Sequence, residues 1–143
     1  MDETTMLRAH VERFLEDHWD VPRVTKDADG DYPFWAGTAQ GYIRVVPAPG
    51  DTCPALVSVF AKAVVGLKSS AALLREVNHL NSRARWAKIF LEDDEVIVAR
   101  EIDRVGAEPE SLALAIDTVT YVADQIGTSI AVVYGGATPN PPH

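Results

Sequence analysis

The chain has few of the features that mark an exported or membrane-spanning protein. Its single cysteine, Cys53, cannot form an internal disulfide and is typical of a reducing compartment. No apolar run approaches the ~20 residues that cross a bilayer, and the acidic N-terminus lacks the apolar core of a secretory signal. We therefore expect a cytoplasmic protein with no membrane partner.

Signatures of catalysis and of cofactor binding are also missing. The chain contains no Gly-x-Ser-x-Gly, phosphate loop, GxGxxG or cysteine pair. No base or cation lies close enough to Cys53 in the sequence to stabilise a thiolate, so we expect this cysteine to be unreactive. The four histidines do not cluster, because even His10 and His18 are too far apart on one helix to share a metal. We predict no enzyme, no cofactor and no metal site.

The segment Asp27-Ala-Asp29-Gly-Asp31 is the closest approach to a metal site. It has the alternating aspartates that open a calcium loop. However, Tyr32 and Thr38 stand where such a loop needs glycine and glutamate. Aspartate and glycine also form tight turns without a metal, so we interpret the segment as a turn.

Basic residues are scarce relative to acidic ones, which leaves a net charge of −8. An acidic surface repels nucleic-acid backbones, so we expect no nucleic-acid partner. The acidic run 92–95 has no basic or metal-binding residue nearby. We expect it at a solvated hairpin tip, where charge protects a sheet edge from aggregation.

The composition is that of one globular domain. The chain has 143 residues, of which 47% are hydrophobic and 24% charged. We expect a single domain over 1–136 and a flexible, proline-rich tail over 137–143.

The hydrophobic pattern predicts the element order α-β-β-β-α-β-β-α. Spacings of three and four apolar positions predict helices over 3–18, 70–82 and 109–134. The alternation of apolar and polar residues predicts strands over 32–37, 40–46, 56–65, 85–91 and 95–102. Because consecutive strands have short connections, we expect an α+β fold with an antiparallel five-stranded sheet packed with helices. Whether the last helix breaks at Gly127 stays open.

The two faces of the predicted sheet differ in character. The face expected to meet the core carries Ile43, Val45, Val57, Val59, Ile89 and Leu91. The opposite face is aromatic and basic, although the chain is acidic, and carries Tyr42, Arg44, Ser58, Phe60, Lys62, Trp86, Lys88 and Phe90. Aromatics flanked by cations are typical of interfaces. We therefore predict a partner-binding surface formed by Tyr42, Arg44, Phe60, Lys62, Trp86, Lys88 and Phe90.

Two structural alternatives compete with this interpretation. Helices that covered both faces would bury the aromatic set. A register shifted by one residue would exchange the two sets of side chains.

The order of short motifs along residues 5 to 136 resembles the YbjN-like family. The motifs are Asp29-Gly30-Asp31-Tyr-Pro-Phe34, Asn78-His-Leu-Asn81, Lys88-Ile-Phe-Leu, Val96-Ile-Val, Tyr121-Val-Ala-Asp124 and Tyr134-Gly-Gly136. The resemblance implies a fold like the type III secretion chaperones, a peptide-binding role and a homodimer. It carries over no catalytic residues. Asn78 and Asn81 match its helix-end pattern, where we expect them to satisfy backbone groups.

We therefore predict a non-enzymatic module that binds a peptide or protein and has a chaperone-like or regulatory role. One alternative is a dimeric scaffold whose sheet face serves only self-association. Another is a small-ligand sensor or an enzyme, for which a pocket with convergent polar groups would be the sign.

Overall fold

The computed structural model describes residues 2–18, 26–104 and 107–140. Its elements confirm the predicted order, with small shifts at their ends. They are α1 (Glu3–His18), β1 (Tyr32–Ala36), β2 (Ala39–Val46), β3 (Leu56–Val64), α2 (Ala71–Arg83), β4 (Lys88–Glu92), β5 (Glu95–Asp103) and α3 (Pro109–Tyr134). None of the described helices has the length and hydropathy of a membrane span.

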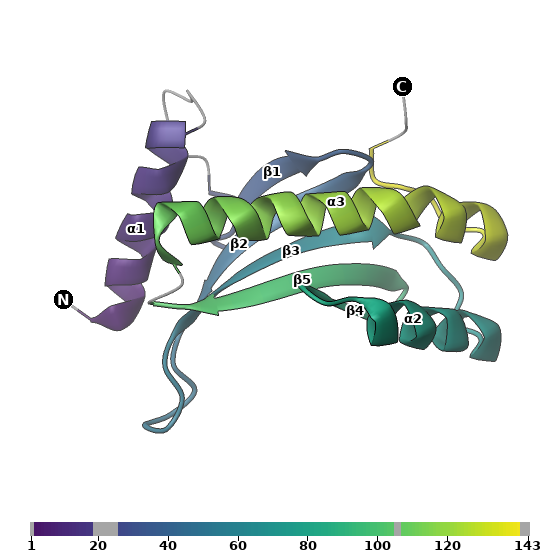
Figure 1. Cartoon of the computed structure of the whole chain (residues 1–143), viewed down its shortest axis with the longest axis horizontal. Helices are drawn as coiled ribbons and strands as arrows, with labels where there is room; N and C mark the ends of the chain where they lie inside the picture. The colour runs from purple at the N-terminus through teal and green to yellow at the C-terminus, as the bar shows by residue number, and fades with distance from the viewer. Residues whose placement is uncertain (1, 19–25, 105–106, 141–143) are drawn as a thin grey trace.

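The five strands form one antiparallel sheet in the order β1-β2-β3-β5-β4. In Figure 1, α3 runs lengthwise over the sheet, α1 crosses near one end and α2 lies beside β4. The residues predicted to face the core do so. Ile43, Val57 and Val59 are fully buried and Ile89 nearly so, in one cluster with Leu7 and Leu112 of the helices. The predicted register is therefore confirmed, and α1 and α3 share one face of the sheet.

α3 continues unbroken through Gly127, which answers the question left open by the sequence. Gly127 is buried where α3 crosses the bulged end of β3, and an added Cβ would lie 2.9 Å from the backbone oxygen of Ala63. The glycine therefore permits a close approach of helix and strand. Pro109 begins the helix and Gly135, with a φ of 84°, ends it as predicted.

The start of the predicted tail is held against the sheet. Ala137 and Val65 exchange two backbone hydrogen bonds. The backbone N–H of Asn140 donates to Thr38 O, and its side-chain amide donates to Ala39 O at 2.8 Å. The tail expected from residue 137 is thus hydrogen-bonded to the domain at Ala137, beside Val65 after β3, and at Asn140, beside the turn between β1 and β2. Residues 141–143 lie outside the described part of the chain.

α2 closes part of an exposed sheet edge. Ser70 caps the helix by accepting a hydrogen bond from the Leu73 N–H. Asn81 near the other end accepts a 2.7 Å hydrogen bond from the Ile89 N–H of edge strand β4. Asn81 thus satisfies a backbone group, as its motif suggested. Asn78 is exposed.

Candidate functional site

Six of the seven predicted site residues lie together on the face of the sheet opposite α1 and α3. We call this surface, formed by Tyr42, Arg44, Phe60, Lys62, Lys88 and Phe90, the open sheet face. The register aligns Tyr42 with Phe60 and Phe90 with Ile97, so the set spans neighbouring strands. The aromatic members are partly exposed, because no described helix covers this side.

The aromatic rings of the open sheet face form an ordered strip. Tyr42 and Phe60 stack with their ring centroids 5.2 Å apart. The Arg44 guanidinium lies 4.9 Å from the Phe60 ring and the Lys62 ammonium 5.7 Å from the Tyr42 ring. Cations in such positions are attracted to the ring quadrupole. The strip is therefore held in place before any partner arrives.

The positive charges on this face are compensated, which corrects the expectation of a basic surface. Arg44 forms a two-pronged ion pair with the buried Asp31, and Lys62 pairs with Glu95 at 3.3 Å. Lys88 pairs with Glu101. Hydrogen bonding from Arg44 to Asp31 raises the pKa of the guanidinium further. The sequence pattern missed this because the three carboxylates come from distant positions. The face is consequently aromatic and close to neutral.

A shallow pocket of about 330 Å³ lies in the middle of the open sheet face. Phe60, Phe90 and Ile97 form its apolar part, and the Lys88–Glu101 pair lies at its border. The pocket can accept an apolar side chain, while the ion pairs around it offer groups to polar backbone atoms.

Two apolar residues of this face were missed by the sequence analysis. Trp35 of β1 pairs with Gln40 and is 66% exposed, and Ile97 of β5 pairs with Phe90. The position of both residues on this face could have been predicted from the register of the two hairpins. A turn at 37–38 places Trp35 opposite Gln40, which has the parity of Tyr42.

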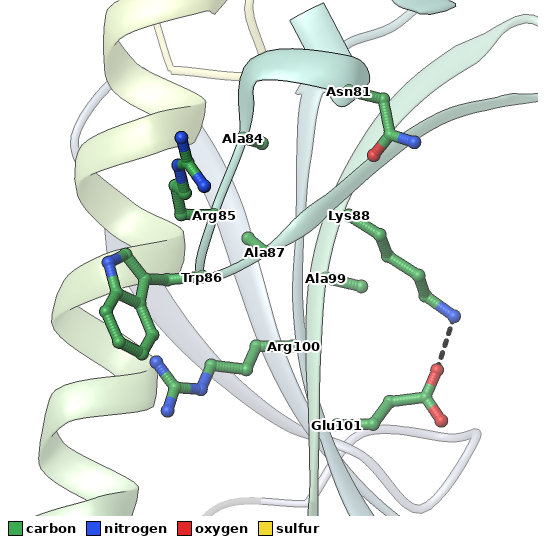
Figure 2. Close-up of a pocket in the computed structure, with 9 residues that line it drawn as sticks. All are labelled: Asn81, Ala84, Arg85, Trp86, Ala87, Lys88, Ala99, Arg100 and Glu101. Carbon is green, nitrogen blue, oxygen red and sulfur yellow. Dashed lines mark hydrogen bonds and ion pairs between the residues drawn. The ribbon is translucent and has the colours of Figure 1, made fainter.

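Trp86 does not lie on the open sheet face, which corrects its predicted position. β4 begins at Lys88 and not at residue 85, so strand alternation does not extend back to Trp86. Figure 2 shows Trp86 and Arg100 directed toward α3, whereas Lys88 and Glu101 point to the other side of the strands. The Arg100 guanidinium lies 5.6 Å from the Trp86 ring. The Trp86 side chain therefore points away from the open sheet face, although Trp86 and Lys88 line one hollow at the sheet edge.

Carboxylates of the calcium-like segment accept hydrogen bonds from other groups of the protein. The carboxylates of Asp27, Asp29 and Asp31 lie within 4.8 Å of one another and are the one such group among the described residues. However, Asp27 Oδ1 accepts hydrogen bonds from the backbone N–H groups of Asp29 and Asp31, each at 2.9 Å. Both oxygens of Asp31 accept from Arg44. These bonds fit the turn interpretation, since Asp27 Oδ1 and both Asp31 oxygens already accept hydrogen bonds within the protein.

Two solved structures share this fold at low sequence identity. A crystal structure of the ExsC–ExsE complex matches with a TM-score of 0.60 and 13% identity, over 90% of this chain and 96% of the other. The crystal structure of YbjN from E. coli, described as a putative transcription regulator, matches with a TM-score of 0.56 and 16% identity, over 97% of both chains. No curated protein sequence matches the chain.

The family comparison covers nearly the whole chain. Residues 5–142 match the family TY-Chap1, described as "T3SS (YopN, CesT) and YbjN peptide-binding chaperone 1". This agrees with the order of motifs along the sequence and with the fold of the sheet and helices. The chain belongs to this family of peptide-binding chaperone domains.

Proposed function

We propose that this protein is a non-enzymatic chaperone that holds an extended, apolar segment of a client protein across the open sheet face. The stacked pair Tyr42 and Phe60, partly exposed on a face with compensated charge, carries the proposal. Exposed aromatic side chains that are already ordered provide contact area at little cost in conformational entropy.

The charge of the face favours an uncharged client segment. Arg44, Lys62 and Lys88 each have an acidic partner, so an acidic client would have to compete with Asp31, Glu95 and Glu101. Aliphatic or aromatic side chains meet no such competition in the pocket between Phe60 and Phe90.

Binding to the face is also favoured over addition of a strand at the edge of β4. The Ile89 N–H at that edge already donates to Asn81. Lys88 lies one residue before it and uses its side chain in the pair with Glu101. The similar fold in a structure of the ExsC–ExsE complex supports a role in binding another protein. A cytoplasmic location fits the exposed free thiol of Cys53.

A homodimer is the second candidate, and one helix favours it. The 26 residues of α3 contain three acidic and no basic side chains, and its outer surface leaves Leu114, Val132 and Val133 more than half exposed. A surface helix normally carries charges on its outer side. These side chains are therefore a candidate contact between two copies, separate from the open sheet face.

Client binding is tested with alanine variants of the open sheet face. Proteins that co-purify with the wild-type chain are identified by mass spectrometry, and peptides covering their sequences are titrated by calorimetry. We expect Phe60→Ala and Phe90→Ala each to weaken binding of the best peptide by about 2 kcal/mol, as loss of an aromatic anchor does. Leu74→Ala, at a half-exposed position on α2, is the matched control and should bind as the wild type does. Equal affinity of all these variants would contradict the proposal.

The mass of the protein in solution distinguishes client binding from homodimer formation. A dimer that dissociates in Val132→Glu but still binds the peptide would support both functions on separate surfaces. A dimer with no peptide partner, disrupted by Phe60→Ala, would instead favour the scaffold alternative.

A further inference from the structure

A second surface, beside α3, has a partly buried cation with one unsatisfied hydrogen-bond donor. Arg100 extends from β5 toward α3, opposite in direction to its neighbours Ala99 and Glu101 (Figure 2). Its Nη1 atom is the one buried side-chain nitrogen or oxygen among the described residues that has no hydrogen-bond partner. Buried donors are normally satisfied, and leaving one unpaired costs about 1–3 kcal/mol. Such a donor favours an acceptor supplied from outside the chain.

The side chain of Trp86 lies beside this cation. The Arg100 guanidinium lies 5.6 Å from the indole ring, and the indole itself is 68% exposed. Stacking on an aromatic ring leaves the edge of a guanidinium available for a planar acceptor. Trp86 thus presents Arg100 to a ligand and also offers an apolar surface next to it.

The charges around Trp86 leave an excess of positive charge. Arg85 and Arg100 flank the indole in Figure 2. Lys88 and Glu101 also line the hollow, and their side chains pair with each other. Asp117 of α3 is the remaining acidic residue that lines this region. Two arginines and one carboxylate therefore face a ligand here, on a chain whose net charge is −8.

The shape of the region suits an extended chain. Two hollows of about 720 and 390 Å³ share the segment 84–87, which includes Trp86. The second reaches Tyr121 and Val122 of α3, where the Tyr121 ring is 67% exposed. We call the two hollows together the Trp86 groove. A carboxylate at Arg100 would be followed along this groove by apolar contacts with Trp86 and Tyr121.

We propose that the Trp86 groove is a second binding site, for a peptide segment that carries an acidic side chain between apolar neighbours. The side-chain carboxylate accepts hydrogen bonds from Arg100, with Arg85 adding attraction, and the neighbouring apolar residues pack on Trp86 and Tyr121. This site adjoins the open sheet face, because Lys88, Ala99 and Glu101 line hollows of both, but it does not include Phe60 or Phe90. Its ligand differs in charge from the uncharged segment that the open sheet face favours.

The test uses the full chain and three short peptides of defined sequence. The probes are Ac-Ala-Leu-Glu-Leu-Ala-NH2, its glutamine twin, and the glutamine peptide with a free C-terminal carboxylate. Binding is followed by the NMR signals of the Trp86 indole N–H and the Arg100 Nε–H, assigned with Trp86→Phe and Arg100→Lys. We expect the glutamate peptide to shift both signals at millimolar concentration. The glutamine twin should bind about tenfold more weakly, because the buried donor then lacks a charged acceptor.

Variants separate this site from the proposed function. Arg100→Gln should abolish the difference between the glutamate and glutamine peptides, whereas Phe60→Ala should leave the groove titration unchanged. Lys62→Gln, which removes a cation on the opposite face, is the matched charge control. Equal shifts from the first two peptides, or no shift, would overturn the proposal.

Two further outcomes would also overturn it. Binding of the free C-terminal carboxylate alone would assign the groove to chain ends and not to acidic side chains. A dimer that covers the Trp86 indole without any peptide would assign the groove to a second copy of the chain.

Discussion

Asp31 and Arg44 form a two-pronged ion pair, with Nε to Oδ1 at 2.8 Å and Nη2 to Oδ2 at 2.7 Å. Asp31 is the buried charged residue of the described core, at 2% exposure, and it ends the acidic turn that precedes β1. The same guanidinium lies over Phe60 on the open sheet face. One side chain therefore joins the turn to the candidate binding surface.

Removing Arg44 should destabilise the protein more than removing another cation of the same face. Arg44→Ala leaves the buried Asp31 carboxylate without its partner, which we expect to cost about 2 kcal/mol. Lys62→Ala removes a partly exposed pair with Glu95 and should cost under about 1 kcal/mol. Urea unfolding of both variants measures the difference. Equal losses would show that the Asp31 pair contributes no more than a surface pair.

Alanine at position 127 should destabilise α3 although alanine is the better helix former. In a free helix Gly→Ala would gain about 1 kcal/mol. Here the new Cβ would lie 2.9 Å from the backbone oxygen of Ala63, so helix and strand must separate. We expect a net loss of about 1–3 kcal/mol, as overpacked cores show. Thermal unfolding tests this, with the exposed Ser129→Ala of α3 as control; a rise in Tm for Gly127→Ala would disprove the close approach.

The stability contributed by Tyr32 should disappear at high pH. Burial, together with the 2.6 Å hydrogen bond to Glu12, raises the pKa of the Tyr32 phenol above its usual value. A raised pKa in the folded state means that the contribution is complete below the unfolded pKa of about 10 and is lost as the pH rises beyond it. Urea midpoints of wild type and Tyr32→Phe, measured from about pH 8 to about pH 11, should therefore converge. A constant difference for Tyr32→Phe would be inconsistent with a raised pKa.

Calcium should not stabilise the protein. Asp31 is held by Arg44, and Asp27 accepts two backbone hydrogen bonds, so a cation would have to displace bonds that the fold already makes. We expect the same Tm with millimolar calcium as with chelator. A ligand that binds only the folded state raises stability by mass action, so an increase in Tm at micromolar calcium would show that the turn is a metal site.

The amino-acid sequence predicted much of the fold, because the signals for helices, strands and turns are local. Periods of two and of about 3.6 place Ile43 and Val59 in the core and define α3 from Pro109 to Tyr134. Short connections imply antiparallel hairpins, and the turn at 93–94 then aligns Phe90 with Ile97. Strand alternation likewise separated the open sheet face from the core.

The tertiary structure decided which charges meet and where the strand pattern stops. Arg44 is paired with Asp31 and Lys88 with Glu101, each thirteen positions away, so the aromatic face is close to neutral and not basic. Trp86 lies before β4 begins, and the side of the sheet it faces depends on its packing beside Arg100 and α3. Periodicity specifies a side chain's direction only within a regular element. The partners of a charge and the direction of a loop residue depend on contacts between distant segments, which only the folded chain brings together.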